Sequence, residues 1–330
     1  DYTANGVKYE EDLNEFGFLK QRSIYDTSGK VIYTTKLVKG SGECKTVYSN
    51  GKLRMSTAFK NCEWDGPVVR YYPNGKVMEK STYVKGNAEG NLQVYDEDGS
   101  IAVTGAYKED KRVGKWTYYY PNGNIESSGY YKNGLKDSIW ISYDEKGHKT
   151  DQVYWLKGDL NGITTYYSPD TDETILVRMF VEDYVKNYAY MAKDNTLIKP
   201  IPIINETVDY KTYYHTGTPA LQFSVKGGFR EGSYITYYSD GKKCEEFNYL
   251  TSDKNGRQIV YYPTGTIQHD DMYLLGEKDG ECKAYYPNGI LKSSEHYVLG
   301  VLHGSCNYYD QQGKLKKTIV YCDGMPSTTL

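Results

Sequence analysis

The sequence predicts an all-β protein, a single elongated antiparallel β-meander of about thirteen 24-residue hairpin repeats with almost no helix. Three observations support this fold. Turn residues recur at intervals of about 24 residues along the 330-residue chain. Tyrosine and glycine are abundant, with 38 and 33 residues. Only 38% of the residues are apolar even when tyrosine is included, and the mean hydropathy is -0.71, so a thin sheet is expected in place of a thick core.

Glycine marks most of the predicted turns. The turn glycines are Gly29, Gly51, Gly75, Gly99, Gly123, Gly147, Gly217, Gly241, Gly265, Gly289 and Gly313. Thr171 and Asn195 take this place in the gap between Gly147 and Gly217. Asn-Gly pairs such as Asn74-Gly75 suit the two positive φ angles of a type I′ turn, which matches the twist of paired strands. We therefore predict a hairpin at each turn residue and no separate domain.

Tyrosine forms a second column of the repeat, four residues before the turn residue. It is found there in 11 of 13 hairpins, as Tyr25, Tyr71, Tyr95, Tyr119, Tyr143, Tyr167, Tyr213, Tyr237, Tyr261, Tyr285 and Tyr309. The position eight residues after the turn is apolar or aromatic throughout, for example Tyr83 and Tyr107. Because side chains alternate along a strand, the two columns are expected on opposite faces of one twisted sheet.

A second glycine precedes the turn by nine residues in nine hairpins. These glycines are Gly42, Gly66, Gly90, Gly114, Gly162, Gly232, Gly256, Gly280 and Gly304. With a two-residue loop, each lies opposite the residue eight after the turn, as Gly114 opposite Tyr131. Glycine has no Cβ, so we expect a slot that the opposite ring covers, and Gly114→Val should clash with Tyr131.

Residues 168–212 depart from the repeat and divide the predicted array into an N-terminal arm, residues 1–167, and a C-terminal arm, residues 213–330. Here the turn glycines are missing and apolar runs appear, while Pro200 and Pro202 cannot donate ladder hydrogen bonds. We expect a kink that exposes a docking surface, with decay of the repeat as the alternative. The candidate partner-binding residues are Met179, Phe180, Tyr184, Tyr188, Ile201 and Ile203.

Two segments carry a resemblance to a known family. The stretch from Gly114 to Gly123, which ends in Tyr-Tyr-Tyr-Pro-Asn-Gly, and the stretch from Tyr285 to Leu291 resemble the bacterial variant of the MORN repeat found in YwqK-type antitoxin proteins. The resemblance extends over nearly the whole chain. It implies an antiparallel meander and a role in protein association. Residues 168–212 lack the Tyr-Tyr-Pro-Asn-Gly core and depart from the family pattern.

Charge and motifs favour a protein partner over other classes of ligand. The net charge is -3 and no run of five like charges occurs, so nucleic acid is not a favoured partner. No stretch approaches the roughly 18 apolar residues of a membrane span, so direct membrane insertion is not expected. Phosphate-binding, dinucleotide-binding and nucleophile motifs are missing from the sequence. We predict no catalysis and no cofactor.

The cysteines and histidines are interpreted as ordinary sheet residues. Cys282 and Cys306 share one column and would lie about 9–10 Å apart, too far to bridge, while Cys306 is expected opposite Ile319. All six cysteines are therefore predicted to be unpaired. The five histidines show no spacing typical of a zinc site, so no metal is expected.

The function predicted from the sequence is a non-catalytic repeat scaffold that mediates protein–protein interaction. We expect an accessory component of a bacterial cell-envelope complex, and the exported location is favoured over the cytoplasm. The chain starts at Asp1 and not at Met, which fits a cleaved precursor or a trimmed chain. The alternatives are a cytoplasmic antitoxin or immunity protein that masks a toxin, and a glycan-binding surface protein.

Overall fold

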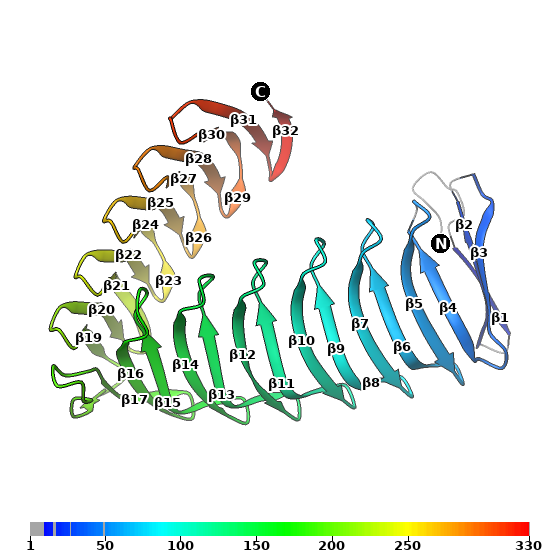
Figure 1. The fold of residues 1–330 in the computed structure, drawn as a ribbon, viewed down its shortest axis with the longest axis horizontal. Coiled ribbons are helices and arrows are strands. Elements are labelled where there is room, and N and C mark those ends of the chain that lie inside the picture. The colour runs from blue at the N-terminus through cyan, green and yellow to red at the C-terminus, as the bar shows by residue number, and fades with distance from the viewer. Residues whose placement is uncertain (1–9, 16–17, 27, 49, 330) are drawn as a thin grey trace. The chain divides into compact units, whose positions relative to one another are not determined.

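The computed structural model describes residues 10–15, 18–26, 28–48 and 50–329, and Figure 1 shows its ribbon. None of these described residues is helical, and strands connected by tight turns account for most of them. The predicted all-β class and the antiparallel meander are confirmed. The chain forms two compact units, unit 1 with residues 1–147 and 154–159, and unit 2 with residues 148–153 and 160–330.

Unit 1 begins with a separate three-stranded sheet, β1-β2-β3, and continues as a meander in which each long strand pairs with the next one. The short strand β8 pairs with β7, so β9 follows β7 in the sheet. The strands are β1 (Glu10–Glu15), β2 (Phe18–Tyr25), β3 (Val31–Lys36), β4 (Gly42–Val47), β5 (Leu53–Lys60), β6 (Glu63–Tyr71), β7 (Val77–Val84), β8 (Asn87–Ala88), β9 (Gly90–Tyr95), β10 (Ile101–Lys108), β11 (Lys111–Tyr119), β12 (Ile125–Lys132) and β13 (Leu135–Tyr143).

Unit 2 contains a break in the strand order. The run that includes β15, β16 and β17 ends at β18, and a new 14-stranded sheet starts at β19, inside the segment 168–212. The strand β14 (Lys149–Leu156) has residues in both units. The others are β15 (Asp159–Tyr167), β16 (Thr174–Val181), β17 (Tyr184–Ala189), β18 (Ile201–Pro202), β19 (Val208–Tyr213), β20 (Pro219–Lys226), β21 (Phe229–Tyr237), β22 (Lys243–Leu250), β23 (Asp253–Lys254), β24 (Gly256–Tyr261), β25 (Ile267–Leu274), β26 (Glu277–Lys278), β27 (Gly280–Tyr285), β28 (Leu291–Val298), β29 (Val301–Leu302), β30 (Gly304–Tyr309), β31 (Leu315–Cys322) and β32 (Met325–Thr329).

The turns at Tyr-Tyr-Pro-Asn-Gly are not the predicted type I′ turns. In the β6–β7 hairpin the Gly75 N–H donates to the Tyr72 carbonyl and the Tyr72 N–H to the Lys76 carbonyl, both at 2.8 Å. Only Gly75, with φ +93°, is left-handed, and Asn74 is not. This pattern is typical of a three-residue loop, a type I turn followed by a left-handed residue. Proline before the asparagine favours it, because proline fixes a negative φ at the first central position.

The predicted pairing of Gly66 with Tyr83 is nevertheless correct. The loop is one residue longer than predicted, and a bulge between Arg70 and Tyr71 shifts the register back by one residue. The two deviations cancel, so the register beyond the bulge is the one that a two-residue loop would give.

Type I′ turns form the opposite ends of the hairpins. Lys85 and Gly86 have φ +49° and +80° between β7 and β8, and Asn133 and Gly134 have +52° and +84° between β12 and β13. Each such turn hydrogen-bonds to the previous repeat, as the Gly86 N–H does to the Trp64 carbonyl at 2.8 Å. The turns of successive repeats therefore stack into a continuous row, which we call a ridge.

Tyrosine and asparagine side chains hold the three-residue loops together. Tyr72 Oη donates to the carbonyl of Tyr95 in the next repeat at 2.8 Å, and the same bond recurs from Tyr48, Tyr120, Tyr214, Tyr238, Tyr262 and Tyr286. Asn74 Oδ1 accepts the Lys76 N–H within its own turn. Its Nδ2 donates to the Glu97 carbonyl of the next turn. The tyrosine column predicted as structural, four residues before the turn, contributes the acceptor carbonyls and is mostly half-buried.

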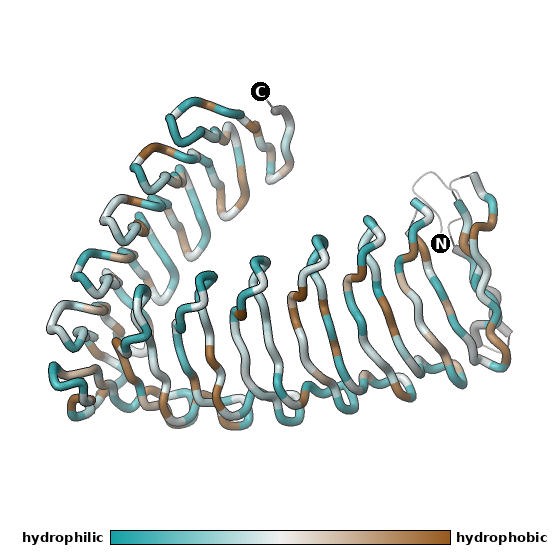
Figure 2. The backbone as a smooth tube through the Cα atoms, viewed as in Figure 1, coloured by the Kyte–Doolittle hydropathy of each residue, from teal (hydrophilic) through white to brown (hydrophobic). Residues whose placement is uncertain are grey.

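The interior column of the repeat lies seven residues before the turn. Its residues vary widely in size but are nearly all buried: Cys44, Val68, Leu92, Trp116, Trp140, Thr164, Tyr188, Tyr210, Gln258, Cys282 and Cys306. Figure 2 shows that hydrophobic residues occur in short stretches along many hairpins and do not gather in one element. A thin sheet of this kind buries one side chain of each repeat deeply and leaves most others half-buried.

The predicted slot at Gly114 is wrong. A Cβ at Gly114 would meet no atom within 4 Å. This glycine has φ +68° and belongs to a bulge in which three residues of β11, from Gly114 to Trp116, face the single residue Gly105 of β10. Positive φ, not a close ring, is the reason for glycine here. The true slots are Gly105 and Gly129, where a Cβ would overlap the indoles of Trp116 and Trp140.

Candidate functional site

The segment 168–212 forms a corner in unit 2 and buries part of the apolar residues that were predicted to be exposed, whereas Tyr184, Leu197 and Ile204 are exposed. Phe180 and Tyr188 are only 6% and 5% exposed. One buried cluster joins Ile175, Leu176 and Tyr188 of β16 and β17 with residues of β19 and β20 and the turn between them, Tyr210, Tyr214, Ala220, Leu221 and Phe223. A second layer therefore covers the apolar surplus that one sheet cannot bury.

The divergent turn after β15 ties this corner to the following sheet. Asp170 accepts hydrogen bonds from the Ser239 N–H and from Ser239 Oγ, the latter at 2.7 Å. Glu173 accepts the His215 N–H at 2.6 Å, and its other oxygen lies 2.9 Å from His215 Nδ1. Asp170, which stands in the place of the turn asparagine, and Glu173 thus bind two later turns, so this part of the segment has a structural role.

The extra loop residue also changes the register of β16. The Ser168 N–H bonds to the Glu173 carbonyl, which encloses four residues where the regular loop has three. Gly162 therefore pairs with Phe180, whereas the 24-residue count had placed Met179 in that column. Met179 is half-buried and pairs with Ile163.

Three of the predicted partner-binding residues line one cavity of about 510 Å³. Phe180, Tyr184 and Ile203 are among its lining residues. Tyr184 is 57% exposed at the rim, whereas Ile201, which does not line the cavity, packs half-buried against the cluster. Its apolar and aromatic walls also include Tyr210, Phe223, Val185, Val208 and Val225.

Two arginines that sequence reasoning missed also line this cavity, Arg178 from β16 and Arg230 from β21. The Arg178 guanidinium lies 4.7 Å from the ring centroid of Tyr166 and 5.1 Å from that of Phe180, and it donates to Tyr166 Oη. Burial lowers the pKa of Arg178. Burial raises the pKa of Tyr210, and the neighbouring Arg178 opposes that shift. The sequence signal for this site was Arg178, the single arginine in the apolar run from Ile175 to Val181.

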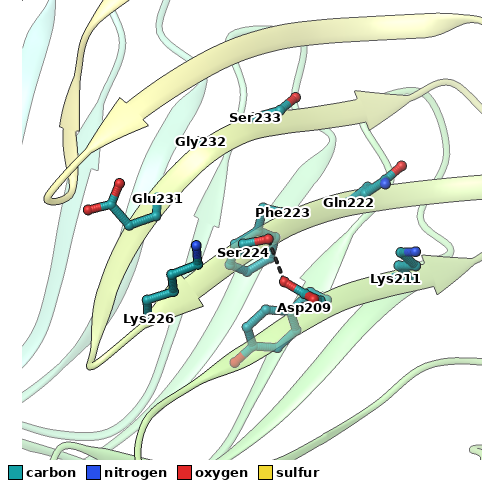
Figure 3. A pocket seen from close by; sticks show the side chains of 10 residues that line it. Asp209, Lys211, Gln222, Phe223, Ser224, Lys226, Glu231, Gly232 and Ser233 are labelled. Atoms are coloured by element: carbon teal, nitrogen blue, oxygen red, sulfur yellow. Dashed lines mark hydrogen bonds between the residues drawn. The ribbon is translucent and has the colours of Figure 1, made fainter.

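A second hollow, of about 500 Å³, lies over β19, β20 and β21, and polar residues line it together with Tyr210 and Phe223 (Figure 3). Asp209 accepts a hydrogen bond from Ser224 Oγ across the two strands at 2.6 Å. Lys211, Lys226 and Glu231 line the same hollow. Along β19 and β20, polar residues alternate with the buried Tyr210 and Phe223. The polar side chains of the hollow therefore lie on the solvated face of this sheet.

The ridges of the two units differ in chemistry. We call the turns at 38–41, 60–63, 84–87, 108–111, 132–135 and 156–159 the unit 1 ridge, and the turns at 204–207, 226–229, 250–253, 274–277, 298–301 and 322–325 the unit 2 ridge. The unit 1 ridge has seven lysines and four carboxylates, whereas the unit 2 ridge has one lysine and four carboxylates. Exposed large apolar residues number four on the former and nine on the latter.

The nine exposed apolar residues of the unit 2 ridge are Ile204, Phe229, Leu250, Leu274, Leu275, Val298, Leu299, Val301 and Met325. Its turns are stacked through backbone hydrogen bonds, from Gly276 to Lys254 at 2.9 Å and from Gly300 to Lys278 at 2.7 Å among others. These residues therefore form one apolar and acidic row.

None of the six cysteines, all of which lie in the described residues, forms a disulfide. Cys306 pairs with Ile319, as predicted. Burial raises the pKa of Cys244 and of Cys282 to about 11, so both thiols are protonated and poorly nucleophilic at neutral pH. Among the described residues, no group of three or more histidine, cysteine or acidic side chains could hold a metal ion. The described part of the chain also contains no helix of membrane-spanning length and hydropathy.

Four segments match the family model described as the MORN repeat variant: residues 64–85, 112–133, 230–250 and 278–298. Together they make up about a quarter of the chain. Residues 64–85 cover most of β6, the three-residue loop and β7, so the matched unit is a hairpin with its three-residue loop. Two matches fall in each unit.

Similar chains are found among solved structures, and no curated protein matches significantly. The structures titled "Crystal Structure of TcdB2-TccC3-Cdc42" and "Crystal Structure of TcdB2-TccC3" are both 12% identical to this chain, with TM-scores of 0.19 and 0.18. In each case the match covers 92% of this chain and 18% of the other chain. This chain therefore spans less than a fifth of the length of those chains.

Proposed function

We propose that this protein is a non-catalytic repeat scaffold that binds another protein through its unit 2 ridge. The four MORN repeat variant matches support a repeat scaffold. The single observation that carries the binding surface is the conformation of Leu275 and Leu299. Both are exposed, at 64% and 60%, and both have left-handed backbones, with φ +49° and +45°.

Leucine at these two positions does not stabilise the fold. A left-handed conformation costs a residue with a Cβ about 1–2 kcal/mol, and asparagine or glycine tolerates it better. In other repeats the equivalent left-handed place is taken by asparagine, as at Asn61, Asn133 and Asn205, or by other polar residues such as Lys85, Glu109 and Thr251. An exposed leucine also buries little apolar surface in the free protein, so it contributes little to the free energy of unfolding. A residue that suits neither the turn nor the solvent is best explained by a contact with a partner.

The chemistry of the ridge indicates what kind of partner it takes. Nine apolar side chains lie among four carboxylates and a single lysine. A complementary surface presents apolar side chains surrounded by lysine or arginine, since unlike charges at the rim speed association and select the partner. The apolar residues would supply the affinity.

Replacement of both leucines by asparagine tests the proposal. The tagged wild-type protein and Leu275→Asn/Leu299→Asn are used to capture partners from the source cells, and bound proteins are identified by mass spectrometry. We expect the double variant to lose a basic partner while its free energy of unfolding is unchanged or higher. Lys85→Asn, at the same turn position of the unit 1 ridge, should retain that partner. Capture of the same proteins by wild type and double variant would contradict the proposal.

The identity of the captured protein also separates the biological settings. An envelope protein supports the expected role in a bacterial cell-envelope complex, and a toxin supports the masking role. Isothermal titration calorimetry of the purified partner with the wild type and with the double variant then gives the contribution of the two leucines to the binding free energy.

A further inference from the structure

The corner cavity of unit 2 contains two guanidinium groups that have no carboxylate counter-ion. Arg178 and Arg230 both line it, and within the described chain neither has a carboxylate oxygen within 4.0 Å. Arg178 Nε is enclosed and has no hydrogen-bond acceptor. Arginines that leave water are usually paired, because an uncompensated charge in an apolar setting is costly.

Aromatic rings only partly compensate the Arg178 charge. The rings of Tyr166 and Phe180 lie 4.7 and 5.1 Å from its guanidinium carbon, within the range of cation–π attraction. Its terminal nitrogen donates to Tyr166 Oη. These partners are neutral, so the positive charge remains available to an anion inside the cavity.

Arg230 supplies the second charge from the opposite wall. Its guanidinium carbon lies 5.4 Å from the ring of Tyr249, and its side chain is exposed. Arg230 is close enough to Arg178 to add to the lowering of the Arg178 pKa. An anion between them would relieve this repulsion.

Two carboxylates, Asp183 and Glu206, also line the cavity and limit the charge of the ligand. Asp183 Oδ1 is occupied by the Leu160 N–H at 2.6 Å. A ligand with two or more negative charges would be repelled by these groups. A single carboxylate that reaches the arginines is compatible with them, and it can accept two parallel N–H bonds from a guanidinium.

We propose that this cavity binds a single carboxylate carried on an apolar body, with the carboxylate between Arg178 and Arg230 and the apolar body against Phe180, Val185, Val208 and Phe223. The volume of about 510 Å³ suits a small organic acid or the last residue of a peptide chain. Both sources present the same chemistry, and they are distinguished by the probes below. The inference rests on Arg178, Arg230 and the apolar walls and not on Leu275 or Leu299, although Glu206, Gly228 and Ser252 line the cavity and also belong to the unit 2 ridge.

Isothermal titration calorimetry with the intact protein tests the site. The probes are 3-phenylpropionate, 3-phenylpropanol, inorganic phosphate, and a hexapeptide ending in phenylalanine with a free or an amidated C-terminus. We expect saturable binding of 3-phenylpropionate, of the free-acid peptide or of both, at least about ten-fold tighter than the alcohol, the amide and phosphate. Preference for the small acid or for the peptide identifies the source.

Variants assign the binding to the arginines. Because the Arg230 side chain is exposed, the Arg230→Gln variant should fold normally. Its affinity for the carboxylate should fall about ten-fold or more. Arg178→Gln should have a similar effect, checked against its melting temperature. Arg257→Gln, which loses only the ion pair with Asp270, is the matched control and should bind like the wild type. Lack of saturable carboxylate binding, equal binding of alcohol and acid, or an unchanged affinity of Arg230→Gln would overturn the proposal.

Discussion

In unit 1, Trp116 and Trp140 fill the interior column, and their indoles lie over Gly105 and Gly129 on the preceding strands. Tyr131 stands between the two indoles, with ring centroids 5.6 and 5.1 Å away in edge-to-face geometry. In the corner of unit 2, the residues of β16 and β17 are instead covered by a second layer formed by β19 and β20. A single sheet can bury large rings when the neighbouring strand offers glycine, whereas a strand rich in branched apolar residues needs another layer.

The corner should be the most sensitive part of unit 2. Phe180→Ala is expected to lower the free energy of unfolding by about 4 kcal/mol, because it removes a ring that is only 6% exposed and that contacts the Arg178 guanidinium. Tyr184→Ala, at the exposed rim, should change it by less than about 0.5 kcal/mol. Urea unfolding followed by far-UV circular dichroism measures both. Equal stability of Phe180→Ala and the wild type would mean that the corner is not packed as described.

The hairpins that contain Trp116 and Trp140 can be destabilised separately from the corner of unit 2. Gly129→Val should cost about 3 kcal/mol, since its side chain overlaps the Trp140 indole and the backbone at Gly129 is already extended. Gly114→Val should cost only about 1–2 kcal/mol, the strain of a positive φ with open space around the Cβ. All four tryptophans lie in unit 1, so tryptophan fluorescence during urea unfolding reports on this unit. A larger loss for Gly114→Val than for Gly129→Val would reverse this assignment.

A smaller and uniform effect is expected at the three-residue loops. Tyr72→Phe removes the bond to the Tyr95 carbonyl, and Tyr286→Phe removes the equivalent bond to the Tyr309 carbonyl, both 2.8 Å long. Each change should cost about 1 kcal/mol, the usual net contribution of one hydrogen bond. Tyr72 belongs to unit 1 and Tyr286 to unit 2, so similar losses would show that both units share this link between repeats. If neither variant lost stability, the tyrosine hydroxyl would not be a stabilising contact.

Sequence reasoning predicted the repeat well and the corner poorly. The 24-residue spacing and the pairing of Gly66 with Tyr83 follow from local rules about turns and alternating side chains. The type of the turn was wrong, because proline before Asn-Gly favours a three-residue loop, and the type I′ turns lie at the other end of the hairpins. At Gly114 the expected neighbour was found, but not the expected reason for glycine.

The candidate site depended on contacts that no local pattern records. Exposed apolar residues were predicted at Phe180 and Tyr188 because a lone sheet could not bury them. The second layer packs Tyr210, which is 22 positions later in the chain, against Tyr188. Arg178 and Arg230 meet in one cavity although 52 residues separate them in the chain. The predicted residues Phe180, Tyr184 and Ile203 line that cavity as a consequence of the same fold.

The sequence by itself therefore determined the repeat unit, its strands and its register, because each of these is set within a single hairpin by turn residues and side-chain alternation. Only the tertiary structure decided where the sheet breaks, which glycines lie beneath rings, and which charged groups share a cavity. Those features depend on the path of the chain between distant segments. A one-residue change in a single loop, as at residues 168–173, shifts the pairing of the strand that follows it, here β16 against β15.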